Sequence, residues 1–154
     1  MKILLVYYSR TNNTRKISEE ISTKLNCDVE EIKDLKERSG KLNYLKSGYD
    51  AIRSKETQIE DMKNDPSDYD LVIVGTPVWA STMATPVLTY LNKNKNKIKD
   101  LAIVVTFGGS GYEKTISNIE ELCGKKAIAT LPISRKDRDS SYDHKIDEFT
   151  NKIE

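Results

Sequence analysis

The stretch KILLVYYSRTNNTR, residues 2–15, decides how this chain folds. Its apolar first half predicts a buried strand, and a run of hydroxyl and amide side chains follows over 9–14. Ile17, Ile21 and Leu25 then recur every four residues, which predicts a helix with one apolar face. The polar turn therefore lies where a strand leads into a helix, and the first N–H groups of a helix have no partner within it. Because the helix dipole also favours negative charge at this end, the sequence predicts an anion site that suits a phosphate.

The remainder of the chain continues this alternation of strands and helices. The apolar patterns predict further strands over 27–32, 70–76, 101–106 and 126–131, and helices over 86–91, 112–123 and 142–153. Five strands separated by helices predict an α/β fold, a three-layer, doubly wound, five-stranded parallel sheet. Crossovers between parallel strands are right-handed almost without exception, which leaves few topologies, and the strand order 2-1-3-4-5 is one of them.

Segment 33–67 is the irregular part of the chain. It is too long for a plain connection, so we expect it to carry structure of its own. Its apolar spacing predicts a helix at about 41–53, and Asn64-Asp65-Pro66-Ser67 predicts a turn. No repeat or linker marks a second unit, and 154 residues suit one core, so we expect a single domain.

Composition excludes several classes of function. The 25 basic and 24 acidic residues leave a formal net charge of +1, so we expect neither a nucleic acid nor a membrane surface as a partner. Cys27 and Cys123 stand alone and His144 is the only histidine, so we expect no metal site. We see no signal-peptide pattern and no apolar run of the roughly 20 residues that span a membrane, and we expect a cytoplasmic protein with reduced thiols.

Three segments that follow predicted strands have unusual compositions. In doubly wound sheets, ligands bind outside the carboxyl ends of the strands, where the strand order reverses. With the order 2-1-3-4-5, the segments 9–14, 76–83 and 106–112 meet there. The first supplies phosphate donors, the second the single tryptophan, Trp79, and the third several glycines that allow close approach of a ligand. A phosphate next to an aromatic ring indicates a flavin or a nucleotide.

These three segments resemble those of the flavodoxin family. Ser9-Arg10-Thr11-Asn12-Asn13-Thr14 is similar to the phosphate loop Ser/Thr-x-Thr-Gly-x-Thr, Gly75-Thr76-Pro77-Val78-Trp79 is similar to the loop that contacts the flavin ring, and Thr106-Phe107-Gly108-Gly109-Ser110-Gly111 is similar to the third loop. The resemblance covers essentially the whole chain in the same order. It implies one flavodoxin-like domain over 1–154 with the strand order 2-1-3-4-5, and FMN as a non-covalent cofactor.

The resemblance also implies which residues bind FMN. It assigns the phosphate to a polar group, the ring to a second group, and the far side or pyrimidine end of the ring to a third. The phosphate group is Ser9, Thr11, Asn12, Asn13 and Thr14, with Arg10 beside it; the ring group is Thr76, Pro77, Val78 and Trp79; the third group is Phe107, Gly108, Gly109 and Tyr112. No catalytic side chain is expected, because the flavin itself carries the redox chemistry.

Two features depart from the family pattern. Asn12 stands where the pattern has glycine, and asparagine tolerates a left-handed backbone better than most residues. Arg10 and Arg15 place positive charge at a loop that in flavodoxins mainly offers neutral donors, so either arginine could reach the phosphate or stay in solvent.

Three functions remain open at this level. The first is an FMN-binding redox protein that carries electrons to or from partner proteins, as a monomer or a homodimer. The alternative is an NAD(P)H-dependent FMN reductase of quinones or similar small acceptors, and the lower alternative is a flavin-free protein-binding module. Two features differ from typical flavodoxin carriers, which are strongly acidic and often have a glycine in the second loop, where the peptide can rotate to hydrogen-bond the reduced flavin. This chain is nearly neutral, and its segment 78–82 has no glycine, so such a rotation would cost more; our hypothesis is that the chain favours two-electron chemistry.

Overall fold

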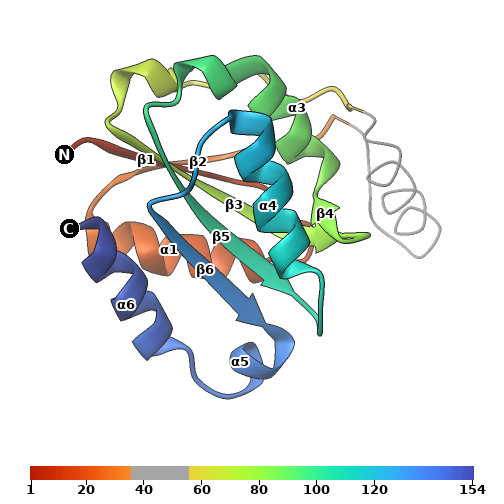
Figure 1. The fold of residues 1–154 in the computed structure, drawn as a ribbon, viewed down its shortest axis with the longest axis vertical. Coiled ribbons are helices and arrows are strands. Elements are labelled where there is room, and N and C mark those ends of the chain that lie inside the picture. Colours follow the sequence, from red (N-terminus) through yellow and green to blue (C-terminus); the bar gives the residue numbers. More distant parts are fainter. Residues whose placement is uncertain (36–55) are drawn as a thin grey trace.

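The computed structural model describes residues 1–35 and 56–154. The helices and strands alternate along the chain as Figure 1 shows. They are β1 (Ile3–Tyr7), α1 (Asn13–Leu25), β2 (Asp28–Glu31), the 3-10 turn η1 (Pro66–Asp68), β3 (Leu71–Trp79), β4 (Thr82–Met83), α3 (Thr85–Asn94), the 3-10 turn η2 (Lys95–Lys97), β5 (Asp100–Phe107), α4 (Tyr112–Cys123), β6 (Ala129–Ser134), α5 (Arg135–Asp139) and α6 (Asp143–Ile153).

The predicted fold class and strand order are confirmed. Five strands pair in parallel in the order β2-β1-β3-β5-β6, which is the expected order 2-1-3-4-5 once the short strand β4 is counted. β4 is the addition: it pairs with β3 in antiparallel fashion and lies off the main path of the sheet. The carboxyl ends of β1, β3 and β5 therefore lie next to one another.

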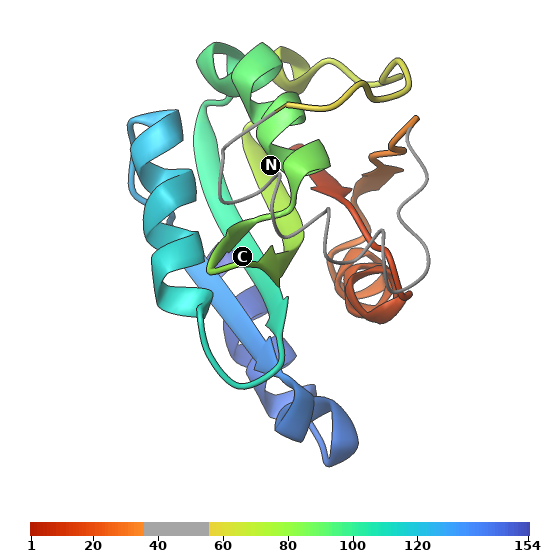
Figure 2. The same ribbon diagram turned by 90° about the vertical axis from the view of Figure 1, so that its right-hand side faces the viewer.

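Helices cover both faces of this sheet. α1 and α6 lie side by side on one face, and α3 and α4 lie side by side on the other (Figures 1 and 2). Alternate residues of each strand enter the two resulting cores, so that Leu4 and Val6 pack toward α3 and α4, whereas Ile3 and Leu5 pack toward α1 and α6. The central strands are apolar on both faces because helices cover both faces.

Gly75 determines how closely α1 approaches the sheet. A Cβ atom at this position of β3 would come within 2.9 Å of the Tyr7 Cβ, 3.2 Å of the Ser18 Oγ and 3.4 Å of the Thr14 Cγ2. Real Cβ atoms are essentially never found at the first of these distances, which is to the paired strand β1, and the other two atoms belong to α1; a side chain here would displace β1 or α1. The first turn of α1, which follows the polar loop, is thereby held against the central strands.

Two predicted strand boundaries were wrong, and one helix was missed. β3 does not end at Thr76 but continues through Trp79 and turns directly into β4, so the second predicted loop is largely a β-hairpin. The last strand lies at 129–134 rather than 126–131, and it continues through Pro132, which the edge position of β6 tolerates because one side of the strand needs no N–H donor. The short helix α5 was not predicted.

The remaining predictions agree with the structure where it can be compared. α4 and its stop at Gly124, in the left-handed conformation with φ 68°, are as expected. The predicted turn at 64–67 overlaps η1, where the Asp65 carboxylate accepts the Ser67 N–H at 3.0 Å. The predicted helix at 41–53 lies outside the described residues. In the described part of the chain, no helix is long and apolar enough to cross a membrane.

Candidate functional site

The polar loop 9–14 has the backbone that an anion site needs. Asn12 adopts the left-handed conformation, with φ 70° and ψ 0°, immediately before the first residue of α1. This is the position at which the family pattern has glycine, and asparagine is among the residues that adopt this conformation most readily. The first intrahelical bond of α1 runs from the Lys16 N–H to the Asn12 carbonyl at 3.0 Å. The preceding N–H groups of the first turn, at Asn13 to Arg15, have no acceptor within the helix.

Two hydroxyl groups in this loop fit a phosphate. The Ser9 Oγ is buried, and it has no hydrogen-bond partner among the described residues. A buried hydroxyl without a partner costs about 1–3 kcal/mol, which a ligand oxygen would recover. The Thr14 Oγ1 is hydrogen-bonded to the Thr106 Oγ1 at 2.8 Å, so that the loop is tied to the end of β5. The donors present, and the orphaned hydroxyl above all, therefore fit a phosphate group.

The two arginines of the loop have different roles. Arg15 forms an ion pair with Glu31 of β2 and donates a second hydrogen bond to the Asn12 Oδ1, and the Glu31 carboxylate raises the pKa of Arg15. Arg15 thus stabilises the left-handed turn from the side of β2. Arg10, in contrast, lines the cavity described next.

A cavity of about 210 Å³ lies at the carboxyl ends of β1, β3 and β5. It joins all three predicted segments, as the sequence pattern required. Its lining consists of Arg10, Thr11, Asn13, Thr14, Pro77, Val78, Trp79, Thr106, Phe107, Gly108 and Arg138. Five predicted residues do not line it: Ser9, Asn12, Thr76, Gly109 and Tyr112. Thr106 and Arg138 are the lining residues that sequence reasoning missed.

Several predicted residues that do not line the cavity support it. Thr76 is fully buried; its Oγ1 accepts the Ala84 N–H at 3.0 Å and donates to the Pro77 carbonyl at 2.8 Å, which fixes the start of α3. The ring of Tyr112 packs against the ring of Phe107, with centroids 4.8 Å apart. Tyr112 therefore supports Phe107, which lines the cavity, without lining the cavity itself. Thr76 anchors the hairpin that carries Trp79.

The β3–β4 hairpin forms the aromatic wall of the cavity. Trp79 is 6% exposed, and its ring meets the ring of Tyr8 edge to face, with centroids 5.4 Å apart. The two residues of the turn, Ala80 and Ser81, have φ angles of 50° and 64°, in the left-handed region that favours glycine or asparagine. Gly111, with φ 95°, packs against this turn: a Cβ there would lie 3.0 Å from the Val78 Cγ1 and 3.3 Å from the Ser81 Cα.

Arg138 reaches the cavity from α5. The helix begins with a capping box in which the Ser134 hydroxyl accepts the Asp137 N–H and the Asp137 carboxylate accepts the Ser134 N–H, a bond that lowers the pKa of Asp137. Arg138 then donates to the Phe107 carbonyl at 3.1 Å and to the Ile133 carbonyl at 3.2 Å, and burial lowers its pKa. The charged run 135–139 is typical of a solvated surface, so only the Ser-x-x-Asp cap could have indicated this helix.

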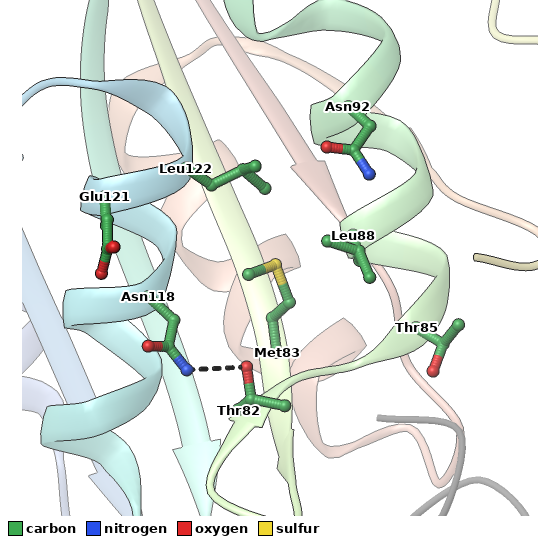
Figure 3. A pocket seen from close by; sticks show the side chains of 8 residues that line it. All are labelled: Thr82, Met83, Thr85, Leu88, Asn92, Asn118, Glu121 and Leu122. Atoms are coloured by element: carbon green, nitrogen blue, oxygen red, sulfur yellow. Dashed lines mark hydrogen bonds between the residues drawn. The ribbon is translucent and has the colours of Figure 1, made fainter. Parts of the chain in front are cut away.

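A second cavity, of about 440 Å³, lies on the other side of the hairpin (Figure 3). It is enclosed by β4, α3 and α4, and the Asn118 amide donates to the Thr82 Oγ1 at 3.0 Å across it. Thr82 and Met83, which line this cavity, pair with Trp79 and Val78, which line the first. The hairpin therefore separates the two cavities, and only the smaller one lies at the ends of β1 and β5.

The fold and this site define a class of protein: a doubly wound α/β domain with a polar loop and an aromatic wall at the switch point of the sheet. A family model described as flavodoxin matches residues 2–130, and the chain belongs to the flavodoxin family. The expected membership is thus confirmed. No relative was found among curated proteins.

Solved structures show the same fold. A flavoprotein from Lactobacillus acidophilus NCFM, whose structure was determined in complex with FMN, is 25% identical and superposes with a TM-score of 0.73 over 97% of this chain and 98% of its own. A flavodoxin from the domain Archaea is 18% identical, with a TM-score of 0.57 and full coverage of both chains. The rubredoxin oxygen:oxidoreductase of Desulfovibrio gigas contains a similar unit: it is 18% identical with a TM-score of 0.60, over 98% of this chain but 34% of its own.

Proposed function

We propose that this chain binds FMN without a covalent bond and carries electrons between partner proteins. The observation that carries the proposal is the cavity at the ends of β1, β3 and β5, which joins the polar loop to aromatic walls. Its lining residue Arg10 directly follows Ser9, whose buried hydroxyl has no partner among the described residues. The chain belongs to the flavodoxin family, and the flavoprotein from Lactobacillus acidophilus, which has a similar length, was determined in complex with FMN.

The loop residues would hold the phosphate. The Ser9 hydroxyl, the free N–H groups of the first turn of α1 and the Arg10 guanidinium are the donors that the loop offers. Each hydrogen bond to a charged group contributes about 1.5–3 kcal/mol, so three of them supply on the order of 5–9 kcal/mol of binding free energy. The aromatic rings of Trp79 and Phe107 would border the flavin ring.

The remaining chemistry belongs to the cofactor. When bound, FMN accepts and donates electrons, and the protein sets its orientation and access. Among the described residues that line the cavity, none is a histidine, cysteine or carboxylate that could act as a general acid, base or nucleophile. Such a lining suits a carrier, whose substrates are electrons, better than an enzyme that must deliver protons from its own side chains.

Titration calorimetry of the apoprotein tests cofactor binding. FMN should bind much more tightly than riboflavin, because riboflavin lacks the phosphate. Ser9→Ala should weaken FMN about tenfold and leave riboflavin unchanged, since one charge-assisted hydrogen bond is lost. Ser110→Ala is the matched control, because Ser110 is an exposed serine of the third segment that does not line the cavity. Equal affinity for FMN and riboflavin would contradict the proposal. If neither FMN nor riboflavin bound, the flavin-free protein-binding module would become the favoured function.

A stopped-flow experiment tests the carrier role. FMN-loaded protein is reduced with dithionite under anaerobic conditions and mixed with ferricytochrome c, which should be reduced rapidly. In parallel, the oxidised protein is mixed with NADH or NADPH, with and without a quinone. Rapid oxidation of NADH or NADPH with turnover of the quinone would contradict the carrier role and support the alternative function, an NAD(P)H-dependent reductase of small acceptors.

A further inference from the structure

A second recess adjoins the flavin cavity on the face of α1 and α6. Its volume is about 310 Å³, within the range of small-ligand sites. It lies between the first turn of α1 and the corner where α5 leads into α6. The recess is lined by Asn13, Lys16, Ile17, Arg135, Arg138, Asp139 and Tyr142.

The charges of this recess favour an anion. Lys16, Arg135 and Arg138 contribute three positive charges, and Asp139 is the acidic residue of the lining. The Arg135 Nε lies 4.0 Å from the Asp139 Oδ2, and both side chains are about three-quarters exposed, so this pair is weak and does not occupy the arginine. Arg138 is half-buried, and part of its guanidinium is already bound to two carbonyls. An excess of positive charge therefore remains available to a phosphate.

The rest of the lining suits a nucleobase. Ile17 is buried and gives the recess an apolar floor, while the half-buried ring of Tyr142 forms one side. The Tyr142 hydroxyl donates to the Glu20 carboxylate at 3.2 Å, which holds the ring in place. An aromatic ring can stack on any nucleobase, and this stacking contributes about 1–3 kcal/mol per base.

The position of the recess indicates which kind of ligand could occupy both the recess and the flavin cavity. Asn13 and Arg138 line both the recess and the flavin cavity, so the two spaces are neighbours on either side of these two side chains, next to the loop 9–14. We propose that the recess binds the adenylate half of FAD, a nucleoside monophosphate joined to the flavin phosphate, so that the chain accepts FAD as well as FMN. The proposal rests on the proposed binding of FMN by this chain.

The test compares FMN and FAD binding to the apoprotein by titration calorimetry at 0.15 M salt, where charges beyond about 8 Å are screened. We expect FAD to bind within about threefold of FMN or more tightly. The double substitution Lys16→Gln with Arg135→Gln should weaken FAD about tenfold or more while FMN changes less than twofold, because neither residue lines the flavin cavity. Lys136→Gln is the matched control, since Lys136 is an exposed cation of the same helix outside the recess.

Substitutions of Tyr142 test independently whether the nucleobase of FAD stacks on its ring. Tyr142→Leu should weaken FAD about fivefold, whereas Tyr142→Phe, which keeps the ring, should restore FAD affinity to within twofold; FMN should respond to neither. Failure of FAD to bind where FMN binds would overturn the proposal, as would equal losses for FMN and FAD in the double variant. Failure of FMN itself to bind would instead overturn the proposed function, so the two failures are distinguishable.

Discussion

The loop 9–14 and the hairpin 78–83 are two walls of one cavity, and they reach the same backbone conformation by different means. Asn12 of the loop and Ala80 and Ser81 of the hairpin all have positive φ. In the loop the residue suits the conformation, and Arg15 adds a hydrogen bond to the Asn12 side chain. In the hairpin the residues are poor for it, and contacts to other elements hold the turn in place. The backbone conformation of a site wall can therefore be set by its own residues or by contacts with neighbouring elements. Substitutions in the wall and in its contacts distinguish these two cases.

The largest effect on stability should come from Gly75, where α1, which follows the loop 9–14, packs against β3. Gly75→Ala places a Cβ 2.9 Å from the Tyr7 Cβ of the paired strand β1 and 3.2 Å from the Ser18 Oγ of α1, so β1 or α1 must shift. We expect the free energy of unfolding to fall by about 2–3 kcal/mol, measured by urea denaturation, and FMN affinity to fall with it. Gly109→Ala is the control, because nothing lies within 4 Å of its added Cβ. An unchanged stability for Gly75→Ala would show that the loop does not depend on this close packing.

The next effect should come from the support of the hairpin. Gly111→Ala introduces a left-handed alanine and also crowds the Val78 Cγ1 and the Ser81 Cα. The expected loss is about 2 kcal/mol in the free energy of unfolding. Gly124→Ala separates the two causes, because Gly124 also has positive φ, at 68°, but open space around it. Equal losses for the two variants would mean that crowding against the hairpin contributes nothing.

A smaller effect should come from the hydroxyl pair that ties the loop to β5. Thr14→Val or Thr106→Val leaves the other buried hydroxyl without its partner and should cost about 1–2 kcal/mol in each case. The double variant should cost clearly less than the sum, because both polar groups are then absent. Additive losses in this double-mutant cycle, measured by urea denaturation, would contradict a direct interaction between the two threonines.

The smallest effects compare the left-handed residues themselves. Asn12→Ala should lower the free energy of unfolding by about 0.5–1 kcal/mol, since alanine adopts this conformation less readily than asparagine. Ala80→Asn with Ser81→Gly should raise it by a similar amount, because this pair suits a two-residue hairpin turn. Thermal unfolding of both variants measures the contrast. A loss of stability in the hairpin variant would mean that the side chains of the turn contribute contacts beyond its backbone shape.

The same contrast explains what the sequence could predict. The buried strands, α1, α4 and the loop 9–14 carry strong local patterns, so the fold class and one wall of the cavity were accessible from the residues, and the resemblance to flavodoxins supplied the strand order. The hairpin was missed because Ala80 and Ser81 carry no turn signal, and a run of strand residues ending in Pro77 and Trp79 resembles a loop. Arg138 was missed because its role depends on the position of α5 beside β5, which is a tertiary contact between segments 31 residues apart.

The hairpin gives the protein one further property. The chain contains a single tryptophan, and Trp79 lines the cavity with its ring against Tyr8. The tryptophan emission of the whole protein therefore originates at one wall of the ligand cavity. A flavin bound there would absorb at the wavelengths at which the indole emits, so the molecule has its own optical reporter of occupancy and needs no label.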